Sequence, residues 1–187
     1  EVDGRFLIQN PPSRYLEEKE MDKIASYPYQ RDLHPYHAKD GKVKALETIK
    51  FSIMTHHGCW GECNYCAIAA HQGRTIRTRS EQNILSEAKH FTTLKDFKGI
   101  ISDVGGPTAN MYGYECKKKM NLGTCIDNKR CVDAHRLCRT MKVDHSRNIK
   151  LLKDIRAIPK VKKAFIASGI RYDFIAADKN HGKEYLK

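Results

Sequence analysis

The chain has 187 residues and a formal charge of +12, with 40% apolar and 30% charged residues. This composition is ordinary for a water-soluble globular protein, and no stretch approaches the roughly 18 to 20 apolar residues of a membrane span. The chain starts at Glu1 without a charged-then-apolar leader, which predicts a fragment of a cytoplasmic protein. The basic excess fits solvated helix faces, with an anionic substrate or RNA as the functional alternative.

The N-terminal quarter and the first strand have different patterns. Residues 1–45 contain four prolines and many tyrosines and histidines, which predicts an irregular lead-in or linker with one helix around Ser13 to Ile24. The core is expected over 46–187. Apolar and polar residues alternate over 49–54, which predicts a half-buried strand that runs directly into a cysteine motif.

Two helices and two further strands are predicted after that motif. Ser80 can cap a helix whose apolar residues repeat at helical spacing up to Phe91, and a second helix runs from Ser146 to its end at Pro159. Short apolar strands are predicted over 99–104 and 161–167. Such alternation of strands and helices builds a parallel sheet, which predicts an α/β fold.

The chemistry-bearing loops follow the predicted strands. The first cysteine motif follows the first strand, Gly105-Gly106 the second, and Ser168 to Asp173 the third. Parallel sheets carry their working residues at the C-terminal ends of strands, so these loops are expected to converge. Arg171 and Asp173 could then face a cavity and bind a carboxylate or phosphate, or form a surface ion pair.

Seven cysteines fall into two local groups. Their odd number argues against a disulfide framework and favours metal ligation in a reducing compartment. The first group comprises Cys59, Cys63 and Cys66, and the second comprises Cys116, Cys125, Cys131 and Cys138.

The first group places thiols at i, i+4 and i+7. Three thiolates from one loop can hold three irons of a cubane and leave the fourth iron open for chemistry. A zinc site is the main alternative, with His56, His57 or His71 as the fourth ligand, and free buried thiols are the other.

The pattern Cys-x-x-x-Cys-x-aromatic-Cys directly after the first strand resembles the signature of the radical-SAM superfamily. Wider stretches resemble its YgiQ-like group, including Gln9-Asn10-Pro11-Pro12, His56-His57-Gly58-Cys59, His71-Gln72-Gly73-Arg74, Gly105 to Tyr112 and Ser168 to Asp173. The resemblance covers nearly the whole chain.

The resemblance implies the first part of a partial TIM-like (β/α) barrel and a 4Fe–4S cluster on Cys59, Cys63 and Cys66. S-adenosylmethionine would chelate the open iron, receive an electron and yield a 5′-deoxyadenosyl radical. Tyr65 would line the adenine pocket. Gly105 and Gly106 would approach the methionine amino group, and Pro107 stands where the superfamily often has an acidic residue.

The implied partners are S-adenosylmethionine and an electron donor such as a flavodoxin or ferredoxin, and the substrate is not identified. A zinc-organised RNA-binding module and a non-catalytic iron–sulfur electron carrier remain alternatives.

The second group lies in a Lys- and Gly-rich stretch, expected to be an insertion over about 108–143. Eight, five and six residues separate its cysteines, which matches no standard zinc finger. Four thiols with little else to bury need an organising centre, which predicts a second iron–sulfur cluster or zinc, with loose thiols as the alternative. His135 and His145 are fallback zinc ligands.

Overall fold

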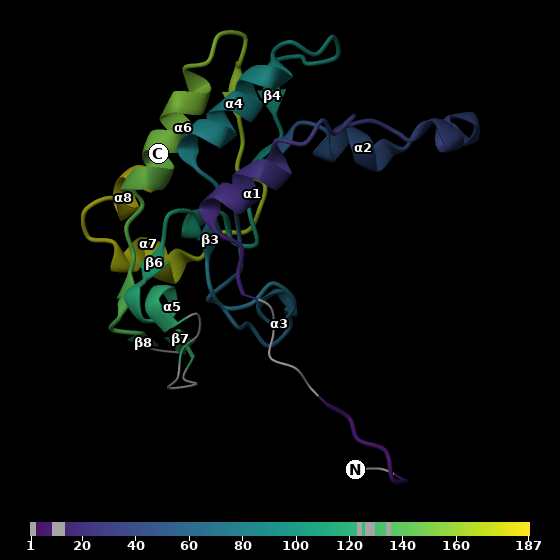
Figure 1. Ribbon diagram of the computed structural model, residues 1–187. Helices are drawn as coiled ribbons and strands as arrows, with labels where there is room; N and C mark the ends of the chain where they lie inside the picture. Colours follow the sequence, from purple (N-terminus) through teal and green to yellow (C-terminus); the bar gives the residue numbers. More distant parts are fainter. Residues whose placement is uncertain (1–2, 9–13, 123–124, 126–129, 134–135) are drawn as a thin grey trace.

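The protein was analysed as a computed structural model, which describes residues 3–8, 14–122, 125, 130–133 and 136–187 (Figure 1). Its centre is made of parallel strand segments. Strand β1 (Ser52–Met54) pairs with β5 (Asp103–Gly105), and β4 (Ile100–Ile101) pairs with β10 (Lys163–Ala164).

Strands β4 and β5 are consecutive, so their shared run lies between β1 and β10. The Ser102 N–H donates to the Phe51 carbonyl at 2.9 Å, and the Val104 N–H donates to the Phe165 carbonyl at 2.8 Å. The prediction of three parallel strand segments is therefore confirmed. In the part of the chain that the structure describes, these segments form small parallel pairings and do not close into a barrel.

Two helices connect these segments, as predicted. Helix α4 (Glu81–Phe91) follows β1, and helix α6 (Ser146–Arg156) precedes β10. The Ser80 hydroxyl caps α4 by accepting the Asn83 N–H at 3.1 Å. Apolar side chains from both helices and the strands form one core, whose fully buried members include Ile53, Ile84, Phe91, Ile101, Leu151 and Ile155.

The N-terminal part contains α1 (Glu18–Ala25), the 3₁₀ helix η1 (Pro35–Asp40) and α2 (Lys44–Ile49). The predicted helix is confirmed from Glu18 onward and was wrong over 14–17, which are not helical, while Ser13 lies outside the described residues. The strand prediction was wrong at Ile49, which ends α2 and is 59% exposed. The Ser52 hydroxyl donates to the Ile49 carbonyl at 2.6 Å, which closes the turn that leads from α2 into β1.

The remaining elements are short. Strands β2 (His56–His57) and β3 (Arg77–Thr78) flank α3 (Ile68–His71), and η2 (Ala109–Met111) follows β5. Strand β6 (Glu115–Cys116) pairs antiparallel with β9 (Met141–Lys142), and β7 (Val132–Asp133) with β8 (Arg136–Leu137). Helix α5 (Lys117–Leu122) follows β6, and helices α7 (Tyr172–Ala177) and α8 (Gly182–Tyr185) follow β10.

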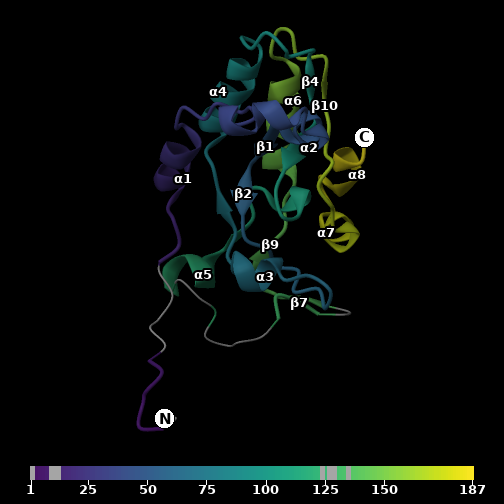
Figure 2. The same ribbon diagram turned by 90° about the vertical axis from the view of Figure 1, so that its right-hand side faces the viewer.

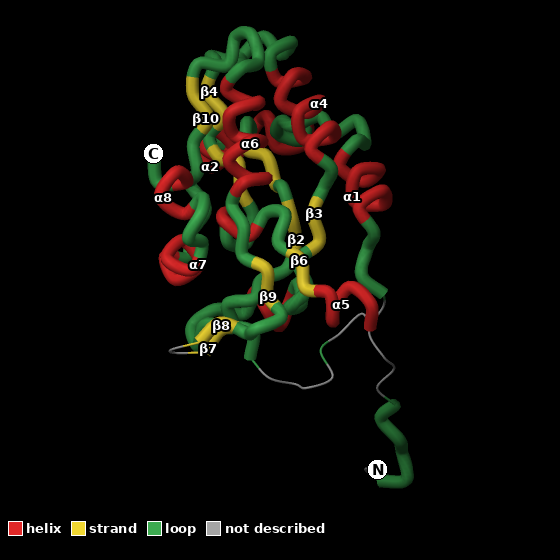
Figure 3. The backbone as a smooth tube through the Cα atoms, turned by 90° about the vertical axis from the view of Figure 1, so that its left-hand side faces the viewer, coloured by secondary structure: helices red, strands yellow, loops and turns green. Residues whose placement is uncertain are grey.

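Both cysteine groups lie at one end of the molecule. Figure 2 shows α3, α5 and β7 at the end opposite α4 and β4, and Figure 3 shows α5 and β7 there as well. Within the described part of the chain, every helix is too short or too polar to span a lipid bilayer.

Candidate iron–sulfur site

The first cysteine group lies in a loop that a two-stranded ladder closes at its base. His56 pairs with Thr78 and His57 with Arg77, so the loop of residues 58–76 begins and ends at this ladder. Gly58 has φ +82°, and a Cβ there would lie 2.2 Å from the Thr75 carbonyl oxygen. Only glycine fits this tight start of the loop.

The three thiols of this loop differ in burial. Cys59 is buried, whereas Cys63 and Cys66 are half-buried. The Gly61 N–H donates to the Cys59 sulfur at 3.2 Å. A Cβ on Gly61 would lie 3.2 Å from the Cys59 sulfur and 3.5 Å from the Cys63 sulfur, so these two thiols flank the same small residue.

The loops after the three strands converge on these thiols, as predicted. The Thr108 hydroxyl lies 3.4 Å from the Cys59 sulfur, and the Arg171 Nη1 donates to the Cys63 sulfur at 3.2 Å. Asn110 joins the second loop to the third, because its amide accepts the Arg171 N–H at 2.8 Å and donates to the Arg171 carbonyl at 2.9 Å.

Arg171 is held in an ion pair as well as against the thiols. Its Nε donates to Asp173 Oδ1 at 3.1 Å and its Nη2 to Oδ2 at 2.5 Å. The hydrogen bonds to Asp173, with smaller contributions from the Cys63 and Cys59 thiolates, raise the pKa of Arg171. The ion-pair alternative is therefore observed, while Nη1 brings positive charge to the cysteine loop.

Gly105 and Gly106 are required by packing. A Cβ on Gly105 would lie 2.4 Å from the Ser168 hydroxyl, and a Cβ on Gly106 would lie 2.6 Å from the His56 ring. His56 is fully buried, its Nδ1 lies 2.8 Å from the Thr55 hydroxyl, and burial lowers the pKa of His56 to about 4. The buried imidazole therefore needs Gly106 to be small, and the contact with Ser168 needs Gly105 to be small.

Tyr65 lies at the surface beside the thiols. Its side chain is 92% exposed, and the charge and hydrogen bonding of the Cys63 thiolate raise the pKa of its hydroxyl. The described residues form no closed pocket around this ring. Its expected contact with adenine stays a prediction, as do the ligand contacts of Gly105, Gly106 and Pro107.

An aromatic cluster behind the loop was missed by sequence reasoning. Trp60, the single tryptophan of the chain, is buried with its ring centroid 5.7 Å from that of Tyr114. The Tyr114 hydroxyl lies 2.8 Å from His145 Nε2, and His145 Nδ1 lies 2.8 Å from Asp178 Oδ2. The position of Trp60 between Cys59 and Cys63 was the one available signal. Both ring nitrogens of His145 are engaged in these contacts, and its fallback role as a zinc ligand stays a prediction.

Cys116 and Cys131 of the second group are buried, and Cys125 and Cys138 are half-buried. The other fallback ligand, His135, and the motif Gln9-Asn10-Pro11-Pro12 lie outside the described residues.

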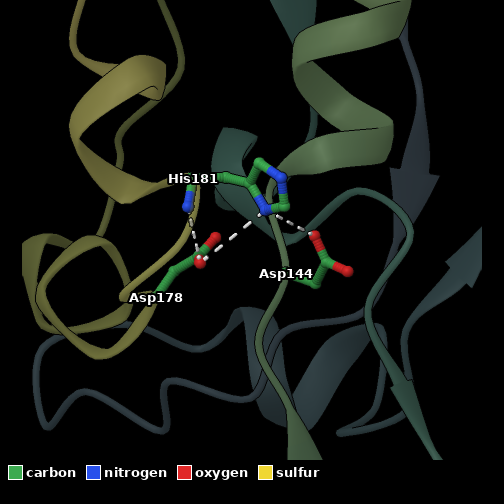
Figure 4. A group of neighbouring side chains, drawn as sticks. All are labelled: Asp144, Asp178 and His181. Atoms are coloured by element: carbon green, nitrogen blue, oxygen red, sulfur yellow. Dashed lines mark hydrogen bonds and ion pairs between the residues drawn. The ribbon is translucent and has the colours of Figure 1, made fainter.

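Three metal-ligand atoms come within 4.8 Å of one another at Asp144, Asp178 and His181 (Figure 4). Their carboxylates already accept backbone hydrogen bonds: Asp144 Oδ1 from Ser146 at 2.9 Å, and Asp178 Oδ1 from His181 at 2.9 Å. Burial alone would raise the pKa of Asp178, but hydrogen bonds from His181, His145 and Asn180 lower it to about 2. These groups therefore act as caps and ion-pair partners that hold α6 and α7 together.

Comparisons with known proteins show which protein families this chain resembles. The Radical SAM N-terminal family matches residues 1–52. A UPF0313 protein of Fusobacterium nucleatum is 56% identical over 99% of this chain, one of Clostridium botulinum is 48% identical over 94%, and one of Clostridium perfringens is 46% identical over 96%. The matched segments are 32%, 27% and 27% of those relatives, so the chain spans about a third of their length or less.

Proposed function

We propose that this chain, which belongs to the radical-SAM superfamily, holds a 4Fe–4S cluster on Cys59, Cys63 and Cys66 and serves reductive cleavage of S-adenosylmethionine. The observation that carries the proposal is the convergence of all three strand-end loops on the Cys59 and Cys63 thiols. When bound, the cluster supplies the low-potential electron that breaks a carbon–sulfur bond of S-adenosylmethionine and starts radical chemistry on a substrate.

The donor set fits a cluster better than a single zinc ion. Zinc with Zn–S bonds of about 2.3 Å would draw tetrahedral sulfurs to about 3.8 Å of one another. Among the residues that the structure describes, the only three potential metal-ligand atoms that all lie within 4.8 Å of one another belong to Asp144, Asp178 and His181. The three thiols are more widely spread, and no described histidine joins two of them at that distance. A cubane binds each thiolate to a different iron and tolerates such a spread.

The chain's own residues prepare the loop for this ligand. Arg171 places a positive charge and an N–H donor at the Cys63 sulfur, where an iron-bound thiolate would carry negative charge. The Gly61 N–H donates to the Cys59 sulfur in the same way. Burial of Cys59 and Trp60 keeps water from one side of the site.

The remaining expectations extend this proposal. Residues 1–45 act as the lead-in and 46–187 as the first part of the barrel, whose other strands belong to the portion that the longer relatives have in addition. Tyr65 and the loop Gly105-Gly106-Pro107 contact S-adenosylmethionine. A cytoplasmic flavodoxin or ferredoxin donates the electron, and the basic surface binds an anionic substrate or RNA.

The test is anaerobic reconstitution of the longer protein with iron and sulfide, followed by a strong reductant and S-adenosylmethionine. We expect formation of 5′-deoxyadenosine and a change in the EPR signal of the reduced cluster on addition of S-adenosylmethionine. Superimposable EPR spectra would support the electron-carrier alternative, and a colourless protein with bound zinc would support the zinc module. Either result overturns the proposal.

A further inference from the structure

We infer that Cys116, Cys125, Cys131 and Cys138 hold a second iron–sulfur cluster, closed by four protein thiolates and packed beside the Trp60 ring. The inference concerns other residues than the first site and does not depend on a cluster there.

The described residues of the segment that carries these cysteines contribute few buried side chains. Between residues 115 and 142, the described side chains that are buried belong to Cys116, Lys119, Cys131 and Val132. The strands here are two residues long, and α5 has six residues. The apolar surface that these described side chains bury does little to offset the loss of chain entropy, which favours cross-linking by a metal centre.

The β6–β9 ladder and the β7–β8 hairpin bring three of the four cysteines into one region. The Thr140 hydroxyl lies 3.8 Å from the Cys116 sulfur and 3.2 Å from the Cys138 sulfur. The Cys138 N–H donates to the Cys131 carbonyl at 2.9 Å, which sets these two cysteines side by side across the β7–β8 hairpin. The fourth, Cys125, lies in the connection between α5 and β7 and is half-buried.

A buried cation faces this group of thiols. Lys119 is 3% exposed, and its ammonium donates to the Cys131 sulfur at 3.0 Å as well as to the Arg74 carbonyl. Burying an ammonium group is costly unless a negative charge compensates it. A metal-bound thiolate supplies that charge, whereas a neutral thiol does not. The position of Lys119 therefore favours a ligated, anionic Cys131.

The geometry favours iron–sulfur over zinc at this site. Cys116, Cys131 and Cys138 are all described, yet no three of the described cysteine sulfurs come within 4.8 Å of one another. A zinc ion would require sulfur–sulfur distances of about 3.8 Å, whereas a cluster spreads its thiolates over separate irons.

The Trp60 ring lies beside both cysteine groups. It is adjacent in sequence to Cys59, belongs to the same buried cluster as Cys116 and Cys131, and has the Lys119 ammonium 5.9 Å from its ring centroid. A cluster with four protein ligands has no open iron and passes electrons. The second cluster is thus suited to electron transfer, with the Trp60 ring packed beside its ligands.

The decisive protein is the variant Cys59→Ala/Cys63→Ala/Cys66→Ala, which removes the first group and leaves the second intact. After anaerobic reconstitution we expect about four iron and four sulfide per chain and an EPR signal that S-adenosylmethionine does not change. Absence of bound iron, or one zinc per chain in protein purified from cells, overturns the inference.

The complementary variant, Cys116→Ala/Cys131→Ala/Cys138→Ala, separates the two proposals. It should keep about four iron, at the first site, with an EPR signal that responds to S-adenosylmethionine. If this variant fails to fold by circular dichroism, the first-group variant still decides. If only the first-group variant lacks iron, the inference of a second cluster is wrong and the proposed function is still supported.

Lys119→Met provides a spectroscopic test of the geometry, with exposed Lys117→Met as the matched control. Loss of the N–H donor and its charge should move the midpoint potential of the second cluster to more negative values in the first-group variant, whereas the control should not. Equal potentials for both variants would overturn the placement of the cluster beside Lys119.

Discussion

The Arg171 guanidinium donates to the Cys63 sulfur at 3.2 Å, although 108 positions separate the two residues. This contact joins the last described strand-end loop to the cysteine loop. Because Asn110 holds the Arg171 backbone on both sides, the guanidinium is positioned by the second loop as well as by Asp173. A charge so fixed beside a ligand thiol sets the electrostatics of the proposed cluster.

Replacing Arg171 by glutamine should lower the potential of the first cluster. A hydrogen bond worth about 1 kcal/mol in the reduced state corresponds to about 40 mV for a one-electron couple. Redox titration followed by EPR measures the shift in the Cys116→Ala/Cys131→Ala/Cys138→Ala background. Arg156→Gln, an exposed change on α6, is the control. An unchanged potential in the Arg171 variant would contradict the contact with Cys63.

The change Cys63→Ala should abolish the brown cluster at the first site, since two thiolates of one loop cannot hold the cubane. Iron content per chain, measured after anaerobic reconstitution, should fall by about four. Asn64→Ala alters an exposed neighbour in the same loop and should keep the full iron content. Full iron retention in a Cys63→Ala protein that also lacks the second group would refute the ligand assignment.

Gly106→Ala should destabilise the fold, because the added methyl would lie 2.6 to 2.9 Å from ring atoms of the buried His56. Overpacking of this kind costs about 1 to 3 kcal/mol of unfolding free energy. Gly169→Ala is the matched control, because nothing lies within 4 Å of its added Cβ and its φ is not in the left-handed region. Urea unfolding of both variants measures the difference. Equal urea midpoints would show that Gly106 and the His56 ring do not pack this tightly.

Asp178 should make the stability of the protein depend on acid pH. Its pKa is lowered from 3.8 to about 2 in the folded state, so its contribution is fully present above about pH 4 and is lost as the pH falls through 2. The shift corresponds to about 2 kcal/mol. Urea unfolding measures the unfolding free energy between pH 5 and pH 2. This free energy should fall less steeply with falling pH for Asp178→Asn than for the exposed control Asp40→Asn. Parallel slopes would mean that the hydrogen bonds to Asp178 contribute little.

The parallel strand segments and both connecting helices were predictable, because their apolar residues repeat at periods of two and 3.6. The convergence of the three loops followed from the order of elements. Ile49 was assigned to the wrong element because an exposed isoleucine at a helix end continues an alternating pattern. The two-residue strands around Cys116 and Cys131 are too short to show any period.

Contacts between distant side chains could not be predicted from spacing. The connection from Trp60 through Tyr114 and His145 to Asp178 depends on how α7 returns to the start of α6. Arg171 fitted either an ion pair or a ligand contact in sequence, and the structure gives it both Asp173 and Cys63 as partners. Such choices are made by tertiary packing rather than by local pattern.

The ladder between β2 and β3 closes the first cysteine loop within 23 consecutive residues, from His56 to Thr78. Bringing together the ends of so short a stretch costs little entropy compared with the distant contact to Arg171. On the ribosome, the three thiols and the ladder at their base are therefore synthesised well before the strands that later cover them. The loops that bear Thr108 and Arg171 reach the Cys59 and Cys63 thiols last, so they would enclose the proposed cluster after its ligands are in place.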